Sequence, residues 1–542
     1  MLSGLYSFAR EISAGSLSEE KRRLYVYGSV TVLALVVLLL VGIGNDLAVT
    51  GAKGCEIASW ARNIAGGVGF TSGSHWMGEV ASESERLGPG AHYPPLAALL
   101  YSLALPLFGQ GAFGALLPSF LLFFAVPIWI LTQDQAAAIG RPALMFTAAA
   151  AALFPPFLHS AFQPDGELLV ALLGGLILAG LFRSREDWDC FWVGLLCGAA
   201  LLVTLDAIAL APACVAGLWL TEEEKTNQPF ARKMAWLLAG WAPGVLALGA
   251  FLGWSAQTAG APSDLSSAFW LLESSRDLGV QRIPISPPLW SFPQLPGGLA
   301  GRFLDGLAEH SKAAVSSAPI WAWGVLAIGM LTGRDALRNR VAVTLVAWAS
   351  VWGWRAFRQA ETSEAFYVVA VWLLILSVET LMRILEAVAR YNRITPPLKT
   401  AALGTLLLIT WWPGFFEIRS LRFDLNPERV GLETLWADRI KELTGPESIL
   451  ITDTPERLAW RTGRRTVWLP ATPSLLDRFE TSEAEMAVVL SGSIQNAPDV
   501  DPAWWELFES GRGAEPFSEV LLDAETYCQV WRKPDSDAFF SE

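Results

Sequence analysis

The sequence predicts a multi-pass α-helical membrane protein with about 11 transmembrane helices and a small α/β soluble domain at its C-terminal end. Of the 542 residues, 53% are hydrophobic and 17% are charged, whereas a soluble protein usually carries about 25% charged residues. Apolar stretches recur along the chain, and about 20 such residues cross a bilayer as a helix. The chain also has 25 Trp, a residue that favours the headgroup boundary and suits a sugar-handling site.

Each predicted span is an apolar stretch with polar flanks. The first follows Lys21, Arg22 and Arg23 and precedes no small-residue cleavage site, so we expect an uncleaved helix. Residues 190–220 leave open a single broken helix in place of two. Residues 94–108 open with a Pro pair and number only fifteen, so we expect a helix lying at the outer surface. The predicted spans are residues 25–43, 113–131, 141–157, 167–183, 190–204, 206–220, 233–254, 317–332, 341–355, 366–383 and 399–416.

The distribution of positive charge predicts which ends of these spans face the cytoplasm. With residues 94–108 kept out of the membrane, the inside segments hold about 17 Lys and Arg in about 80 residues, against about 9 in about 135 outside. Cytoplasmic loops carry such an excess. We therefore expect a cytoplasmic N-terminus and a C-terminal domain that is periplasmic or extracellular.

Two long outer loops and the C-terminal part stand out from the spans. Loops 44–112 and 256–316 exceed the usual length of connections, which is typical of functional segments. We expect residues 1–417 to form the transmembrane domain and residues 418–542 the soluble one, with a helix at 433–443 and strands at 448–452 and 466–469. Residues 418–542 hold 13 Lys and Arg against 23 Asp and Glu. This acidic balance argues against a nucleic-acid partner.

Cysteine and carboxylate spacing indicate neither a zinc site nor a disulfide framework. The five cysteines form no CxxC pair, and a bridge between Cys55 and Cys528 is the alternative left open. The outer carboxylates could bind a divalent cation, but no ligand spacing demands one. We therefore assign no metal ligands.

Two stretches resemble a known superfamily. Residues 55–70, CEIASWARNIAGGVGF, followed by residues 92–96 and 107–109, resemble the first periplasmic loop of GT-C membrane glycosyltransferases. The nearest branch is that of protein mannosyltransferases, aminoarabinose transferases and Rgt-like bacterial enzymes, whose soluble C-terminal part residues 451–470 also resemble. The resemblance implies transfer of a sugar from a polyprenyl-phosphate-linked donor to a lipid, glycan or protein acceptor at the outer face of the cytoplasmic membrane.

The resemblance also implies candidate catalytic residues. The family places an acidic residue about nine positions before Arg62, where this chain has Lys53. Glu56 coincides with a second acidic position, Asp46 lies upstream of the first, and Asp165 precedes a span where the family has an acid. A carboxylate there can act as general base on an acceptor hydroxyl. The alternatives are a solvated helix face for Glu56 and helix capping for the two aspartates.

Further polar residues are candidates for binding the substrate or its phosphate, because charge-assisted bonds to phosphate favour cations. The candidates are Arg62, His92, Tyr93, Glu167 and Arg358. The alternatives are an ion pair for Arg62, a structural role for His92, and snorkelling at the membrane interface for Arg358, which we also favour for Arg355. The family often has Arg or Lys where this chain has Leu205, and the adjacent Asp206 is costly in a span unless partnered, so we expect a cavity or a short turn there.

Two other classes of function stay open. A transporter or flippase would be expected to show internal repeats and interrupted helices at the midplane, and the sequence has no convincing repeat. A non-catalytic scaffold for cell-envelope glycan assembly is favoured by two positions. Lys53 stands where the family has an acidic residue, and Leu205 stands where the family often has Arg or Lys. The leading hypothesis is an inverting glycosyltransferase.

Overall fold

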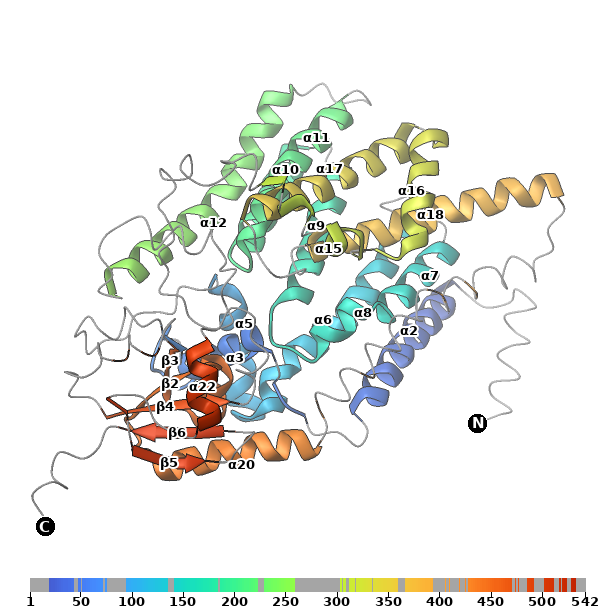
Figure 1. Cartoon of the computed structure of the whole chain (residues 1–542). Helices are drawn as coiled ribbons and strands as arrows, with labels where there is room; N and C mark the ends of the chain where they lie inside the picture. Colours follow the sequence, from blue (N-terminus) through green and yellow to red (C-terminus); the bar gives the residue numbers. More distant parts are fainter. Residues whose placement is uncertain are drawn as a thin grey trace, which may run out of the picture.

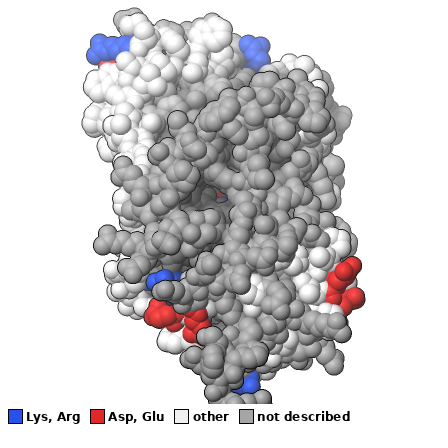
Figure 2. Space-filling view, turned by 60° about the vertical axis from the view of Figure 1, so that its left-hand side comes forward, with Lys and Arg blue, Asp and Glu red and all other residues white. Residues whose placement is uncertain are grey.

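The computed structural model consists of a helical bundle and a mixed β-sheet that lies against one end of it (Figure 1). On the face shown in Figure 2, most of the visible acidic side chains lie at the lower end, which carries the sheet in Figure 1. The structure describes residues 19–42, 47–49, 51–71, 74–75, 94–134, 141–183, 186–222, 229–258, 303–304, 306–308, 311–316, 318–333, 335–358, 366–392, 405, 409, 419, 425, 427–469, 473, 476, 485–491, 502–510, 516–517, 519–523 and 528–532.

The helices of the bundle overlap the predicted spans, because long apolar runs form helices even where they contain a proline, as α6 and α12 do. Its elements are α2 (Glu19–Gly42), α3 (Ala52–Ala65), α5 (Leu96–Phe108), α6 (Ala112–Leu131), η1 (Thr132–Asp134), α7 (Arg141–Ala152), α8 (Pro155–Ala161), α9 (Glu167–Arg183), α10 (Asp187–Leu201), η2 (Leu205–Leu210), α11 (Ala211–Glu222), α12 (Phe230–Thr258), α15 (Ser311–Ser316), α16 (Ile320–Thr332), α17 (Asp335–Arg358) and α18 (Tyr367–Asn392).

Membrane-crossing helices are present in the bundle, as the sequence predicts for a multi-pass protein. Among the described residues, α6, residues 230–251 of α12 and residues 367–388 of α18 are each long and apolar enough to cross a bilayer. The pair α7 and α8 meets the same test but is bent by 53°. The predicted span 399–416 lies almost wholly outside the described residues, so the count of eleven stays a prediction.

Two predicted spans differ in their boundaries. Residues 141–157 were expected to form one helix, but α7 ends at Ala152 and α8 begins at Pro155. The two prolines at 155 and 156 lack an amide donor and disfavour a helical residue before them, which explains the break. Residues 190–220 form two helices, α10 and α11, separated by a turn and the short η2.

Helix α5 has only 13 residues. At 1.5 Å per residue it is about 20 Å long, short of the roughly 30 Å hydrocarbon core. It packs against α3 and α6, and the expectation that this apolar stretch lies at the outer surface stays a prediction.

Glycines allow α10 and α12 to pack backbone against backbone. A Cβ at Gly194 would lie 2.0 Å from the Leu237 carbonyl oxygen, and a Cβ at Gly240 would lie 2.0 Å from the Phe191 carbonyl oxygen. Small residues on facing helices permit such approaches in membranes. The pair α10 and α12 is thereby held together beside the candidate site.

The sheet has strand order β1-β3-β2-β4-β6-β5. Strands β1, β3, β2 and β4 run parallel, whereas β6 is antiparallel to β4 and β5. The sequence correctly predicts a helix and two strands here. The strand ends differ by one residue, and the helix begins six residues earlier than predicted, at Pro427. The elements are β1 (Ser74–His75), α20 (Pro427–Leu443), β2 (Ile449–Thr452), α21 (Pro455–Thr462), β3 (Arg465–Trp468), β4 (Met486–Ser491), α22 (Pro502–Ser510), β5 (Glu519–Asp523) and β6 (Cys528–Arg532).

Both faces of the sheet are covered by helices. Side chains alternate between the faces of a strand, and here Ile449 and Ile451 contact the cluster that contains Trp504 of α22. Leu450 faces the other way, into the cluster of Ile440 from α20 and Leu458 from α21. Helix α21, on that second side, also packs against α3 of the bundle.

The first outer loop supplies an edge strand that the sequence did not predict. Ser74 and His75 pair in parallel with Thr466 and Val467 of β3. A two-residue strand has too short a pattern to be recognised without its partner. This pairing ties the first outer loop to the C-terminal sheet, so both lie on the same side of the bundle.

Candidate functional site

The candidate site lies where α3 and the start of α9 meet the ends of α5 and α10. Gly166 precedes α9 with φ 79°, and a Cβ there would lie 3.0 Å from Ala97 and 3.2 Å from Val203. Glycine suits both the left-handed backbone and the close approach. The loop that carries Asp165 and Glu167 is therefore held against α5 and α10.

A chain of buried hydroxyls supports this loop from α5 and α6. The Ser119 hydroxyl donates to the Gln163 carbonyl at 2.6 Å and lies 2.7 Å from the Tyr101 hydroxyl. Burial and the neighbouring Asp165 carboxylate raise the pKa of Tyr101, so its phenol stays protonated. Asp165 Oδ1 in turn accepts a hydrogen bond of 3.0 Å from the Glu167 amide. Asp165 therefore caps α9, as the alternative interpretation predicted.

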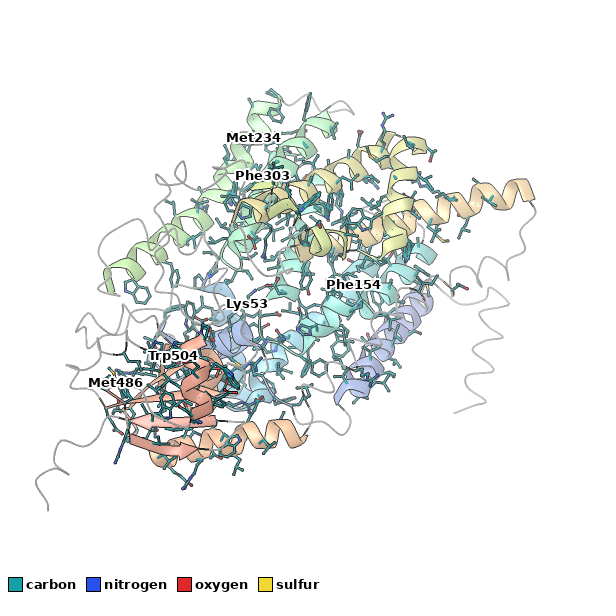
Figure 3. All side chains as sticks on the ribbon, viewed as in Figure 1. Lys53, Phe154, Met234, Phe303, Met486 and Trp504 are labelled. Atoms are coloured by element: carbon teal, nitrogen blue, oxygen red, sulfur yellow. The ribbon has the colours of Figure 1, made fainter. Side chains whose placement is uncertain are left out.

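Lys53 reaches this loop from α3. Its ammonium forms an ion pair with the carboxylate of Glu167, which is buried. A Cβ at the adjacent Gly54 would lie 3.0 Å from Pro164 Cδ, so the start of α3 is packed closely on the loop. Figure 3 places Lys53 between the sheet and the helices of the bundle. Lys53, which stands where the family has an acidic residue, thus has Glu167 as its carboxylate partner. A buried charge needs such a partner.

Helix α3 presents different chemistry on its two faces. Lys53, Glu56 and Trp60 are spaced three and four residues apart, which places them on one side of a helix with 3.6 residues per turn. Cys55 and Arg62 lie on the other side, toward α21. The electrostatic effect of α20 and α21 charges on Cys55, together with the contacts of Arg62, supports this orientation. Burial raises the pKa of the Cys55 thiol to about 12.

Glu56 is a buried residue. Its exposed fraction is 2%, so the alternative of a solvated helix face is wrong. It stands one turn from Lys53, and residues at this spacing are neighbours on a helix surface. A buried carboxylate beside a cation, at the surface of a membrane bundle, is an arrangement expected of a functional site more often than of a structural one.

Arg62 contacts the C-terminal domain. Its guanidinium donates to the carbonyl oxygens of Trp460 at 2.9 Å and Ala459 at 3.1 Å, and it lies 4.8 Å from the centre of the Trp460 ring. Burial lowers the pKa of Arg62 from its usual value. Its contacts thus hold α21 on α3 and face away from Lys53. A role in phosphate binding would require these bonds to be given up.

A second buried ion pair lies near the same junction. Asp206, in η2, bonds to Arg355 at 2.8 Å and accepts a hydrogen bond of 3.1 Å from the Trp354 indole. The expected partner and short turn at Asp206 are both present. The interpretation of Arg355 as a snorkelling residue is wrong, because its side chain is 3% exposed and paired.

Four of the predicted site residues receive no structural test. Asp46, His92 and Tyr93 lie outside the described residues, and for Arg358 only the backbone, at the end of α17, is described. The structure brings Lys53, Glu56, Asp165 and Glu167 to one junction. It places Arg62 on the opposite face of α3.

The cysteines form no disulfides in the structure. The bridge between Cys55 and Cys528 that was left open is therefore not formed. Within the described ranges, no group of three or more His, Cys, Asp and Glu side chains is arranged to hold a metal ion.

Some polar groups of this region were missed from the sequence. Ser59 and Trp60 are buried, and neither the Ser59 hydroxyl nor the Trp60 indole N–H has a hydrogen-bond partner within the described structure. Their residue types give no signal, because serine and tryptophan are common in helices and their partners depend on tertiary contacts. In the sequence, Lys53 marks only the position where the family has an acidic residue, whereas its partner Glu167 is a candidate for binding the substrate or its phosphate.

Comparison with known proteins gives a match at the level of fold. No protein-family model and no curated protein sequence matches the chain. Among solved structures, ArnT from Cupriavidus metallidurans bound to undecaprenyl phosphate is similar, with a TM-score of 0.57, 13% identity, and coverage of 94% of this chain and 98% of that one. Its apo state has a TM-score of 0.54, 14% identity, and coverage of 93% and 97%.

A second enzyme of the same superfamily is also similar. The apo oligosaccharyltransferase of Archaeoglobus fulgidus has a TM-score of 0.52 and 13% identity, with coverage of 86% of this chain and 70% of that one. The fold of this chain is that of the GT-C membrane glycosyltransferases. The resemblance carried by residues 55–70 and 451–470 is thereby confirmed for the fold.

Proposed function

We propose that this protein, a multi-pass membrane protein with the GT-C fold, is an inverting glycosyltransferase that uses a polyprenyl-phosphate-linked sugar. The observation that carries the proposal is the ion pair of Lys53, whose side chain is 18% exposed, with the buried Glu167. Lys53 stands one helical turn from the buried Glu56. This arrangement provides a cation for a phosphate and a carboxylate for a proton in the same place. A lipid-linked donor can reach it sideways from the bilayer.

In the proposed reaction, Glu56 acts as general base. Its carboxylate takes the proton of the acceptor hydroxyl as that oxygen bonds to the anomeric carbon of the donor. The bond between this carbon and the phosphate oxygen breaks, and the phosphate leaves with the electron pair. Attack from the side opposite the phosphate inverts the anomeric configuration. Asp46 stays the second candidate for the base.

Lys53 stabilises the departing phosphate in this proposal. An ammonium carries three N–H donors, so it can hold a carboxylate and a phosphate oxygen together. Glu167 positions Lys53, and Asp165 positions Glu167 through the bond to its amide. Buried and preorganised charge is more effective than charge in water. Arg355, another buried cation of the described structure, forms an ion pair with Asp206.

We also propose that the site faces the outside of the cytoplasmic membrane, where the acceptor is a lipid, a glycan or a protein. The contacts of α3 with α21 and of β1 with β3 support a shared side for the first loop and the C-terminal sheet. The excess of Lys and Arg in the opposite loops supports the assignment of that side as the outer one.

The proposal is tested with purified protein and radiolabelled undecaprenyl-phosphate sugars. Release of free undecaprenyl phosphate with transfer of label to an acceptor fraction is the expected result. Counterflow of the intact labelled lipid across proteoliposomes, without bond cleavage, would indicate a flippase. Glu442→Gln is the matched control for substitutions of Glu56, because Glu442 is 66% exposed and pairs with Arg439 on its own helix.

A non-catalytic scaffold is the second candidate. It is favoured by Lys53, which stands where the family has an acid and is already paired with Glu167. A scaffold would bind a glycan or lipid carrier and release no phosphate lipid in the same assay.

A further inference from the structure

Helix α3 carries two further buried polar groups without partners, one on the face of Lys53 and Glu56 and one at the edge of that face. Ser59 and Trp60 are each 1% exposed, and neither the Ser59 hydroxyl nor the Trp60 indole N–H forms a hydrogen bond within the described structure. A buried donor or acceptor left unsatisfied costs about 1–3 kcal/mol. Two such groups on consecutive residues are unusual, because buried polar groups are nearly always bonded.

Helical spacing places these groups close to the charged residues. Trp60 follows Glu56 by four residues and lies one turn further along the side that carries Lys53. Ser59 follows Glu56 by three residues and lies at the edge of this side, between Glu56 and Arg62. Lys53 lies one turn before Glu56. The face therefore presents, in order along the helix, a cation, a carboxylate and an indole N–H, with the Ser59 hydroxyl at its edge.

Aromatic rings from three segments surround this end of α3. Trp60 packs edge to face on Phe251 of α12, with ring centroids 6.2 Å apart. Phe70, from the segment after α3, contacts Phe251 at 6.0 Å and Trp254 at 6.2 Å. Trp60 thus belongs to an aromatic cluster, and Ser59 is its neighbour in the chain.

This combination matches the chemistry of a sugar ring. A pyranose has apolar C–H faces that pack on aromatic rings and hydroxyls that both donate and accept hydrogen bonds. The indole N–H of Trp60 is a donor only, whereas the Ser59 hydroxyl donates and accepts. A prenyl chain forms no hydrogen bonds and would satisfy neither group. A phosphate could accept from both groups, but it has no apolar face to pack on the aromatic rings.

We propose that Ser59 and Trp60 bind hydroxyl groups of the sugar carried by the lipid donor and so determine which sugar is accepted. This inference rests on the proposed function, with Lys53 at the phosphate and Glu56 at the anomeric carbon. The order of groups along α3 then follows the order of groups along the substrate. Ser59 and Trp60 act in binding and take no part in proton transfer.

The test measures lipid binding to purified protein in nanodiscs. The probes are undecaprenyl phosphate and its glucosyl, mannosyl and aminoarabinosyl derivatives. Trp60→Phe removes the N–H and keeps a ring, and Ser59→Ala removes the hydroxyl. We expect each substitution to weaken binding of the preferred glycosylated lipid about three- to tenfold, as for the loss of one hydrogen bond. Binding of undecaprenyl phosphate itself should not change.

Two matched controls separate binding from packing. Trp372→Phe removes a buried indole N–H that donates to Gly175, and Ser102→Ala removes a buried hydroxyl that donates to Leu99. Both should lower the melting temperature without altering the preference for a glycosylated lipid. Ser59→Ala should leave the melting temperature of the lipid-free protein unchanged or raise it, because it removes an unsatisfied group. Trp60→Phe leaves a small cavity but breaks no hydrogen bond, so it should lower the melting temperature less than Trp372→Phe does.

The outcomes distinguish this inference from the proposed function. Unchanged binding of every glycosylated lipid by Trp60→Phe and Ser59→Ala would overturn the inference, whether or not the wild type transfers sugar. A wild type that binds no glycosylated probe more tightly than undecaprenyl phosphate would overturn it as well. Weakened binding in both variants, in a protein that transfers no sugar, would keep the inference and overturn the proposed transferase activity.

Discussion

The ammonium of Lys53, in the first outer loop, is bonded to the carboxylate of Glu167, which begins a helix 114 residues further along the chain. Glu167 is buried and Lys53 is largely so. Breaking a buried ion pair by removal of one partner leaves an uncompensated charge, and this is usually more costly than replacing both partners. The pair therefore links α3 to the bundle and makes the placement of each partner dependent on the other.

Lys53→Met should lower the free energy of unfolding by about 3 kcal/mol, because Glu167 is left buried without its cation. The double variant Lys53→Met with Glu167→Gln should recover part of this loss. Thermal unfolding in detergent measures both, with Lys441→Met as the exposed control. Strict additivity of the two single substitutions would mean that the residues do not interact.

Arg62→Lys should loosen the C-terminal domain from α3. A lysine cannot donate to the Trp460 and Ala459 carbonyls in the geometry of a guanidinium or stack on the indole ring in the same way. Hydrogen exchange of α21 amides should therefore be faster in the variant. Arg439→Lys, on the exposed face of α20, is the matched control. Unchanged protection of α21 would show that Arg62 does not hold the domain.

The stability of the C-terminal domain should depend on pH through Glu456. Burial raises the pKa of Glu456 from 4.5 to about 8. The folded carboxyl thus keeps its proton in a range where the unfolded one has lost it. Its contribution to stability is complete below about pH 4.5 and is lost progressively as the pH rises to about 8.

Glu456→Gln should remove this dependence, and melting temperatures recorded from pH 5 to pH 8 would measure it. The variant should be the more stable protein at pH 8 and should show a flatter profile. Glu442→Gln, in an exposed position, should keep the wild-type profile. A profile of Glu456→Gln with the full wild-type slope would assign the pH dependence to another group.

Gly166→Ala should reduce sugar transfer at least tenfold. The alanine Cβ would meet Ala97 and Val203 at 3.0 and 3.2 Å, and the loop with Asp165 and Glu167 would have to shift. Small misplacements of catalytic groups carry large costs in rate. Gly67→Ala is a matched control, because Gly67 has the same φ of 79° but no atom within 4 Å of the added Cβ. Equal activity of the two variants would contradict the role of the loop.

The fold was predictable where the signal is local. Residues 113–131 and 167–183 are continuous apolar runs, and they form α6 and α9 with at most one residue of difference. The strand at residues 449–452 is marked by a short run of β-branched and aliphatic residues. The break before Pro155 was also local, but the apolar run that crosses it obscured the proline pair.

Features that depend on distant partners could not be predicted. Nothing near Ser74 marks β1, because the strand exists only by pairing with β3. The sequence indicated that Asp206 needs a partner, but Arg355 is about 150 residues away and resembles an ordinary interfacial arginine. Arg62 and Glu56 belong to the same short motif, yet the helix turns them to opposite faces.

The rate of a single turnover depends on the proposed roles of the α3 residues. The direct measurement is the rate at which purified Glu56→Gln releases undecaprenyl phosphate from a bound labelled donor, compared with Glu442→Gln. Glu56→Gln should bind the donor as the wild type does and release the carrier at least a hundredfold more slowly. Release at the wild-type rate by Glu56→Gln would show that the buried carboxylate beside Lys53 is not the base of the reaction.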